Sequence, residues 1–189
     1  MPPIYVCFLS NDEEIMERHW LNAVAAKVAP KSDHDPKIHV ELFFANSESN
    51  QKSDVMHGQA CSIYYGGSVF LTQKRFSRKQ WCFRTLSCTQ QQYDNTYKFC
   101  KEHAGENFNY LSYFLQPTGW GPGPYSLTSF GFYPRWFCSE IVIEALKHGG
   151  VLSGKVKTSM HPQELFNILE DITTPNSLRN YTEVSLKFI

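Results

Sequence analysis

The sequence predicts an α+β fold in which an antiparallel sheet packs against helices. Residues 37–44 alternate apolar and polar side chains at the two-residue period of a strand. Two further β-rich runs are joined by Gly66-Gly67, which is typical of a hairpin. Residues 137–147 carry apolar side chains at helical spacing and follow the strands along the chain. This order favours the α+β class.

Length and composition favour one globular unit. The chain has 189 residues, enough for a core without metal or disulfide support, so we expect a single domain over residues 1–189. Hydrophobic residues make up 42% and charged residues 19%, which excludes a disordered chain. The formal net charge of +0 gives no signature of nucleic-acid binding. No apolar run reaches the roughly 18 residues of a membrane-spanning helix.

The first part of the chain reads as a strand, a helix and a second strand. We expect a strand over residues 3–10, then a helix capped by Asn11 or Asp12 and bounded by Pro30. Residues 31–36 form a polar loop before the strand at 37–44. That strand presents Ile38, Val40, Leu42 and Phe44 to one face, and His39, Glu41 and Phe43 to the other.

The middle and the end of the chain add strands, helices and one long loop. The Ser/Asn-rich residues 46–53 read as a loop. Strands are expected at 59–65, 68–73, 81–86 and 183–189, and helices at 89–103, 137–147 and 162–169. Gly105 and Gly149-Gly150 end two of these helices.

Residues 116–134 are rich in glycine and proline and must form a loop. Its aromatic residues are too apolar for a solvated linker. They either line or cover a substrate cleft, or fill the core beneath the following helix. These rings are Trp120, Tyr125, Phe130, Phe132 and Tyr133.

Among six cysteines, Cys138 alone lies where a long loop leads into a helix. No Cys-x-x-Cys pair occurs, which disfavours a zinc ribbon or a thioredoxin-type site, and we expect no metal and no cofactor. At a helix start the dipole lowers the pKa of a thiol. The free N–H groups there can also bind an oxyanion. Cys138 is therefore a candidate nucleophile, and the alternative is an inert buried cysteine.

His39 is the candidate general base, because a rigid strand can hold its ring within reach of a thiol. A third group should orient the imidazole. Glu41 shares the face of His39, and Gln59 and Ser62 lie on the next expected strand. The ordinary interpretation of all three is that they are solvated strand residues.

Three motifs in this order resemble the circularly permuted papain-like cysteine peptidases of the NlpC type, which have bacterial and viral members. The motifs are His39-Val40-Glu41-Leu42, then Gly105-Glu106-Asn107-Phe108-Asn109-Tyr110, then Trp136-Phe137-Cys138-Ser139-Glu140-Ile141-Val142. The resemblance covers residues 38–146. Lecithin–retinol acyltransferase-like proteins are relatives of that family.

The resemblance implies a permuted papain-like fold with Cys138 as nucleophile, His39 as base and Glu140 as a structural or orienting residue. It implies hydrolysis of a peptide or isopeptide bond through a thioester acyl-enzyme. Members of the family often carry an acidic residue on the strand after the histidine. Residues 59–63 offer no acid, so Glu41 is the substitute that we expect.

Two other functions stay open. One is an acyltransferase or lipid thiolesterase on the same fold, and the other is a non-catalytic binding module in which Cys138 is inert. Thiol reactivity separates the module from the enzymes. The expected partner is therefore a peptide, a protein or an acyl-lipid substrate, with no nucleic acid and no transmembrane segment. The absence of a signal-peptide pattern favours a cytoplasmic location.

Overall fold

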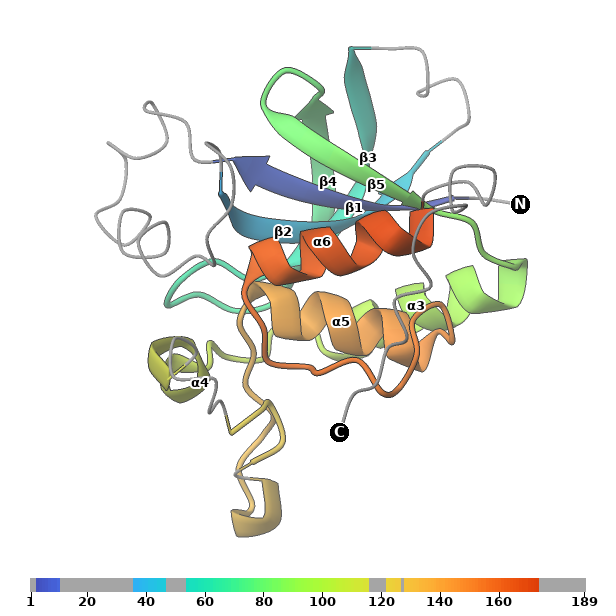
Figure 1. Ribbon diagram of the computed structural model, residues 1–189. Helices are drawn as coiled ribbons and strands as arrows, with labels where there is room; N and C mark the ends of the chain where they lie inside the picture. The colour runs from blue at the N-terminus through green and yellow to red at the C-terminus, as the bar shows by residue number, and fades with distance from the viewer. Residues whose placement is uncertain (1–2, 11–35, 47–53, 116–121, 127, 174–189) are drawn as a thin grey trace.

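The computed structural model describes residues 3–10, 36–46, 54–115, 122–126 and 128–173. Within them the expected α+β class is confirmed: an antiparallel sheet packs against helices (Figure 1). The helix expected after Asn11, the strand expected at 183–189, and Trp120 lie outside these residues. None of the helices in the described ranges combines the length and the apolar character needed to cross a bilayer.

The sheet is antiparallel throughout, with the strand order β4-β3-β2-β1-β5, so β2 lies at its centre. Alternation of side chains along β2 separates two faces, as the sequence predicts. The register pairs Phe8 with Val40, and Leu42 with Cys61. The strands are β1 (Ile4–Ser10), β2 (Lys37–Ala45), β3 (Val55–Ser62), β4 (Phe70–Ser77) and β5 (Trp81–Leu86).

The hairpin between β3 and β4 is confirmed, but its strands are shifted from the expected ranges. Seven residues, 63–69, connect the strands instead of the glycine pair alone. The turn already begins at Tyr64, whose carbonyl accepts the Gly67 N–H at 3.0 Å, and Gly66 takes a φ of 73° that favours glycine. The pairing therefore extends away from the turn, toward Val55 and Ser77.

The sheet is strongly curled. β4 and β5 lie at opposite edges, yet only residues 78–80 separate them in the chain. The ring of Phe76 on β4 contacts Trp81 and Phe83 on β5, with centroids 4.8 and 6.3 Å apart. The concave face therefore encloses an apolar cluster of its own. Its buried members are Tyr5, Cys7, Phe43, Met56, Ala60 and Phe76.

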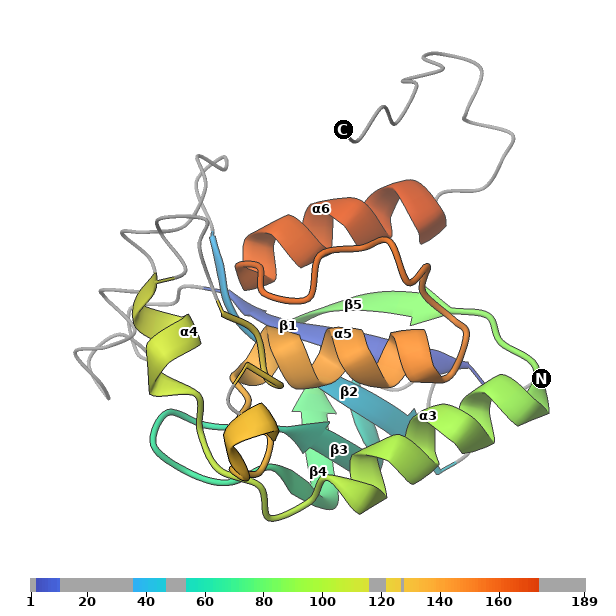
Figure 2. The same cartoon turned by 90° about the horizontal axis from the view of Figure 1, so that it is seen from below.

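The helices cover the other face of the sheet. α5 (Cys138–His148) and α6 (Pro162–Thr173) pack against β2, and α3 (Gln90–Glu102) packs along α5 (Figure 2). α4 (Tyr110–Leu115) is a short helix in a segment to which the sequence analysis assigns no element. The main core between sheet and helices includes Val6, Val40, Leu42, Ile63, Trp136, Ile141, Val142, Leu146 and Leu165.

Local signals fix where the helices begin. Thr89 Oγ1 accepts the Gln92 N–H at 3.1 Å, and Gln92 Oε1 accepts the Thr89 N–H at 2.9 Å, which completes a capping box before α3. At the start of α5, Glu140 accepts the N–H of Phe137 at 3.1 Å. The α5 helix therefore begins at Cys138 itself.

The loop before α5 does not fill the core. In its described part, the 3-10 helix η3 (Thr128–Phe130) projects away from the sheet (Figure 1). Phe130 is 77% exposed and Tyr133 is 83% exposed. Phe132 and Tyr125 are also exposed, although Tyr125 contacts Trp136 at 5.5 Å between ring centroids. The core-filling interpretation is therefore wrong for these rings.

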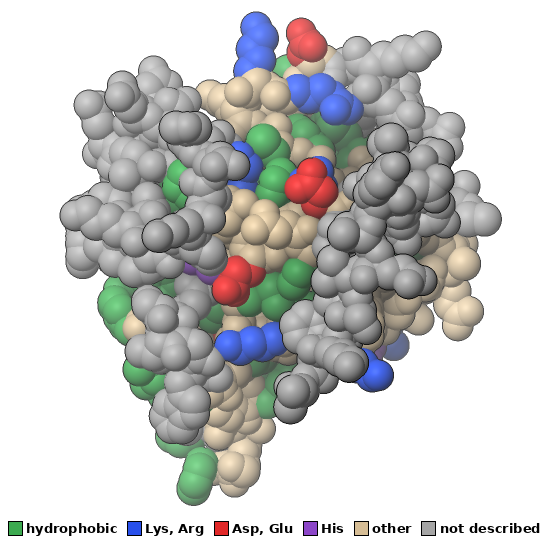
Figure 3. Space-filling model, in the orientation of Figure 1, with side chains coloured by type: hydrophobic (Ala, Val, Ile, Leu, Met, Phe, Trp, Pro, Cys, Tyr) green, Lys and Arg blue, Asp and Glu red, His purple; other side chains and the backbone are tan. Residues whose placement is uncertain are grey.

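Charged side chains are interspersed on the face seen in Figure 3. Among the residues coloured there, Lys and Arg alternate with Asp and Glu, and neither sign forms a broad patch. This pattern agrees with the formal net charge of +0.

Gly149 allows α3 and α5 to approach closely. An added Cβ would lie 1.9 Å from Thr96 Oγ1 and 2.9 Å from the Gln92 carbonyl oxygen. We expect Gly149→Ala to lower the free energy of unfolding by about 1–3 kcal/mol, because α5 must move away from α3. Urea denaturation measures the change.

Gly154→Ala is the matched control, since no atom lies within 4 Å of the Cβ that it adds. It should change the unfolding free energy by less than about 0.5 kcal/mol. Equal effects of the two alanines would contradict the close approach.

Candidate active site

Cys138 opens α5 and lies at the edge of the main core, 9% exposed. The residue before it, Phe137, is extended with φ −119° and ψ 174°, so the chain turns sharply into the helix. The N–H groups of Cys138 and Ser139 belong to the first helical turn, where backbone donors have no intrahelical acceptor. They lie at the positive end of the helix dipole, the end of α5 at which Cys138 stands.

The structure brings His39 to Cys138. β2 and α5 both begin at the same end of the molecule (Figures 1 and 2). The imidazole lies within hydrogen-bonding range of the Cys138 side chain, an interaction that helps to raise the pKa of His39. Its Nε2 lies 3.2 Å from Glu41 Oε1, which leaves Nδ1 for the thiol. Three side chains of the sequence motifs thus contact one another in series: Cys138, His39 and Glu41. His39 and Cys138 are 99 positions apart in the sequence.

Glu41 is fully buried, so its interpretation as a solvated strand residue is wrong. Lys74 Nζ donates to both carboxylate oxygens, at 2.6 and 2.8 Å, and the Tyr64 hydroxyl donates to Oε1 at 3.2 Å. Burial alone raises the pKa of Glu41, but the hydrogen bond and charge of His39, with those of Lys74, lower it below its usual value. The carboxyl group is therefore ionised at neutral pH.

The pKa of His39 is raised to about 9. Burial opposes this shift, but the hydrogen-bonding and charge interactions with Cys138 outweigh burial, and Glu41 adds to the effect. At neutral pH the ring is therefore held as an imidazolium between two groups that favour its positive charge.

Tyr64 and Lys74 belong to the site, although no motif pointed to them. The Tyr64 ring stacks on the His39 ring, with centroids 5.2 Å apart and planes 21° apart, and Trp81 meets the imidazole edge-on at 6.3 Å. Extending the β2–β3 register by three residues places Tyr64 opposite His39. Lys74 shares a face of β4 with the buried Phe76, and a lysine on an inward-facing strand position indicates a buried anionic partner.

Gln59 does not orient the imidazole, which corrects the expectation from the sequence. The register pairs Gln59 with Phe44, on the face that the helices cover, whereas His39 belongs to the concave face. Gln59 Oε1 instead accepts a hydrogen bond from the Tyr97 hydroxyl at 2.5 Å. Ser62 Oγ donates to the Val40 carbonyl at 2.7 Å.

Glu140 joins three segments around the nucleophile candidate. Its buried carboxyl group accepts the Phe137 N–H, the Asn109 side-chain amide at 3.3 Å, and the Ser159 hydroxyl. These partners are neutral, and burial raises the pKa of Glu140 to about 7 although the hydrogen bonds lower it. Glu140 thus fixes the start of α5 against the segment that contains Asn109.

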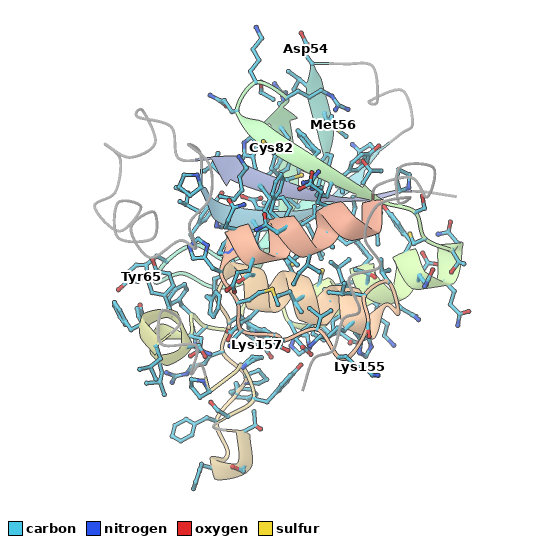
Figure 4. The ribbon with its side chains drawn as sticks, in the orientation of Figure 1. Asp54, Met56, Tyr65, Cys82, Lys155 and Lys157 are labelled. Atoms are coloured by element: carbon cyan, nitrogen blue, oxygen red, sulfur yellow. The ribbon has the colours of Figure 1, made fainter. Side chains whose placement is uncertain are left out.

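Beside Cys138 lies an exposed aromatic surface, formed by Tyr65, Tyr110, Leu111 and Phe114. The ring of Tyr65 contacts Phe108, Tyr110, Tyr113 and Phe114, with centroids 5.0 to 6.4 Å apart, and lies next to α4 (Figure 4). Tyr113 connects this surface to the site: burial and the charge of Cys138 raise its pKa to about 12. No charged residue occurs in residues 62–69 or 108–115.

No protein-family model, no curated protein and no solved structure matches this chain. The site therefore has to be interpreted from its own chemistry. Within the described ranges, no three His, Cys, Asp or Glu side chains are grouped so as to hold a metal ion.

The raised pKa of Glu140 has a consequence for stability. Between pH 4.5, its ordinary value, and about 7, the folded protein retains the Glu140 proton that the unfolded chain releases. We expect this carboxyl group to lower the unfolding free energy by roughly 2–3 kcal/mol as pH rises through that window. Glu140→Gln should remove this loss, as urea denaturation at several pH values will measure.

Glu102→Gln serves as control, because Glu102 is 53% exposed on α3. His39, with its pKa raised to about 9, also costs stability as pH rises above 6.5, but equally in all three proteins. If the variant and the wild type lose stability in parallel from pH 4.5 to 7, Glu140 does not titrate as described.

Proposed function

We propose that this protein is a cysteine-dependent hydrolase that cleaves an amide bond, in a peptide or an isopeptide linkage, through a thioester acyl-enzyme. The observation that carries the proposal is the position of the His39 imidazole between the Cys138 side chain and the Glu41 carboxylate. A nucleophile, a base and an orienting acid in contact constitute the machinery of thiol catalysis.

In the proposed reaction the Cys138 thiolate attacks the carbonyl carbon of the substrate. The oxyanion that forms accepts hydrogen bonds from the first-turn N–H groups of α5. The His39 imidazolium gives its proton to the leaving nitrogen, the C–N bond breaks, and an amine departs. His39 then takes a proton from water, whose oxygen attacks the thioester. The acid product leaves, the Cys138 thiolate is regenerated, and His39 again carries its proton.

A permuted papain-like fold is part of the proposal. Two features support it: the histidine strand β2 precedes the cysteine helix α5 along the chain, and α5 packs on the antiparallel sheet to which β2 belongs. The contact of Asn109 with Glu140 also joins the second and third of the sequence motifs that carry the resemblance.

A second candidate function is acyl transfer or thioester hydrolysis with a lipid acyl chain. The exposed aromatic surface beside Cys138 favours it, because an uncharged surface adjoining a nucleophile suits an apolar acyl group. The chemistry at Cys138 and His39 is the same, and only the acyl group and its acceptor differ.

The reactivity of Cys138 tests the proposed machinery. We expect limiting iodoacetamide on the folded protein, followed by peptide mass analysis, to label Cys138 before the other cysteines. Cys82 is the internal control, because it is more exposed on β5 than the buried Cys138 (Figure 4). If solvent access alone sets the rate of alkylation, Cys82 should be labelled first. If His39 activates the thiol, Cys138 should be labelled first.

His39→Asn should abolish this preference without unfolding the protein, since the amide retains a polar group at that position. Earlier labelling of Cys82, or equal rates in wild type and His39→Asn, would argue for an inert Cys138 and for the binding module.

Acyl chain length separates the two candidate functions. We compare kcat/KM for the acetyl, octanoyl and dodecanoyl esters of nitrophenol with that for peptide amides. A lipid-directed enzyme should gain activity with chain length, and Phe114→Ser should remove most of that gain because Phe114 is 56% exposed on the aromatic surface. Phe130→Ser is the matched control, since Phe130 lies in the projecting η3.

A peptidase should instead prefer the amides and show the same small response to both serine variants. A gain with chain length that survives Phe114→Ser would contradict a role of the aromatic surface.

A further inference from the structure

Lys74, on β4, contacts two residues of the candidate site, Glu41 and Tyr64. Its ammonium group donates to both oxygens of Glu41 and to the Tyr64 hydroxyl, the last at 2.7 Å. Glu41 contacts His39, and Tyr64 stacks on His39. One cation thus contacts both groups that hold the imidazole.

Four aromatic rings surround the Lys74 ammonium group. The ammonium lies over the rings of Tyr64, Phe70, Phe76 and Trp81, at 5.2 to 5.6 Å from their centroids. Such cation–π contacts favour the charged form and restrain a flexible side chain. The Lys74 side chain is only 22% exposed, and the charge of Glu41 raises its pKa although burial lowers it.

Glu41 needs a positive neighbour whose charge does not change during turnover. A fully buried carboxylate without a counter-charge takes up a proton. His39 supplies a positive charge in the resting state, but in the proposed reaction it gives its proton to the leaving group. At that stage Lys74 is the cation that still contacts Glu41 among the residues that the structure describes.

We propose that Lys74 is a positioning residue of the Cys138–His39 pair: it keeps Glu41 ionised and aimed at His39 Nε2 in both protonation states of the ring, and it holds Tyr64 stacked on that ring. This inference rests on the function proposed above. Lys74 touches neither the substrate nor the reacting atoms, and acts through Glu41 and Tyr64.

Two further titratable groups face Glu41. Cys7 on β1 is paired with it in the sheet register, and burial raises the pKa of this thiol well above its usual range. The charge of Arg78, in the turn after β4, also acts on Cys7. Burial raises the pKa of Tyr64 as well. Cys7 and Tyr64 therefore stay neutral at physiological pH. Among the described residues, Lys74 and His39 are the cations in contact with Glu41.

The test follows the Glu41 carboxyl group and Cys138 separately. The first measurement is the titration of the Glu41 side-chain carbon by NMR, assigned with Glu41→Gln. The second is the pH profile of Cys138 alkylation. Lys74→Met removes the charge and keeps the stem, Lys74→Arg restores the charge, and Lys98→Met is the control for an exposed lysine, 71% exposed on α3.

We expect Lys74→Met to move the titration of Glu41 upward by about one to three pH units. The acid limb of the alkylation profile should move in the same direction, because a protonated Glu41 no longer favours the imidazolium. Lys74→Arg should restore most of both shifts, and Lys98→Met should produce neither.

Failure of the inference and failure of the proposed function are distinguishable. If wild-type Cys138 is unreactive, the function fails, while the Glu41 titration still reports the pairing with Lys74. If Glu41 titrates unchanged in Lys74→Met, or moves without a change in the Cys138 profile, Lys74 is not a positioning residue.

Lys74→Met leaves a buried carboxylate unpaired and can fail to fold. The pair Glu41→Gln and Glu41→Gln/Lys74→Met avoids this problem, since neither protein buries that charge. If Lys74 acts through Glu41, adding Lys74→Met to Glu41→Gln should change the rate of Cys138 alkylation less than about twofold. A tenfold further loss would overturn that route.

Discussion

The arrangement of the site depends on the burial of one carboxylate, that of Glu41. Removal of an ionised carboxyl group from water is costly unless cations and hydrogen-bond donors replace the solvent. Glu41 obtains them from its own strand, from β4 and from the turn after β3, as His39, Lys74 and Tyr64. These side chains converge because the sheet is curled, so the curl and the charge network support each other.

A second buried carboxylate, Glu140, shows how environment separates two chemically identical groups. Glu41 is paired with two cations and has a lowered pKa, whereas Glu140 accepts hydrogen bonds from neutral donors and has a raised pKa. The first environment maintains a charge next to the imidazole. The second fixes the backbone at the start of α5 while tolerating a proton, so the two carboxyl groups position His39 and Cys138 respectively.

Local patterns predicted most of this structure, and non-local pairing accounts for what they missed. The alternation in residues 37–44 gave β2 and placed His39 and Glu41 on one face, and Thr89 and Gly149 marked the ends of helices. Alternation cannot tell whether a face is covered, however. Phe76 and Trp81, from opposite edges of the sheet, contact each other on the face that carries Glu41, so the burial of Glu41 was not readable from the sequence.

Four side chains contact one another in series: Cys138, His39, Glu41 and Lys74. Their charges alternate in sign when Cys138 is a thiolate. A neutral amide in place of Glu41 would orient the imidazole equally well, but it would not favour the imidazolium by charge. A carboxylate does both, and in a buried site it needs a permanent cation of its own. In the family that the sequence motifs resemble, an acidic residue often lies on the strand after the histidine. Residues 59–63 contain no acid, and here Glu41 lies on β2, the same strand as His39. On β2 the Glu41 carboxylate is buried within reach of β4, and Lys74 on β4 supplies the cation that this position requires.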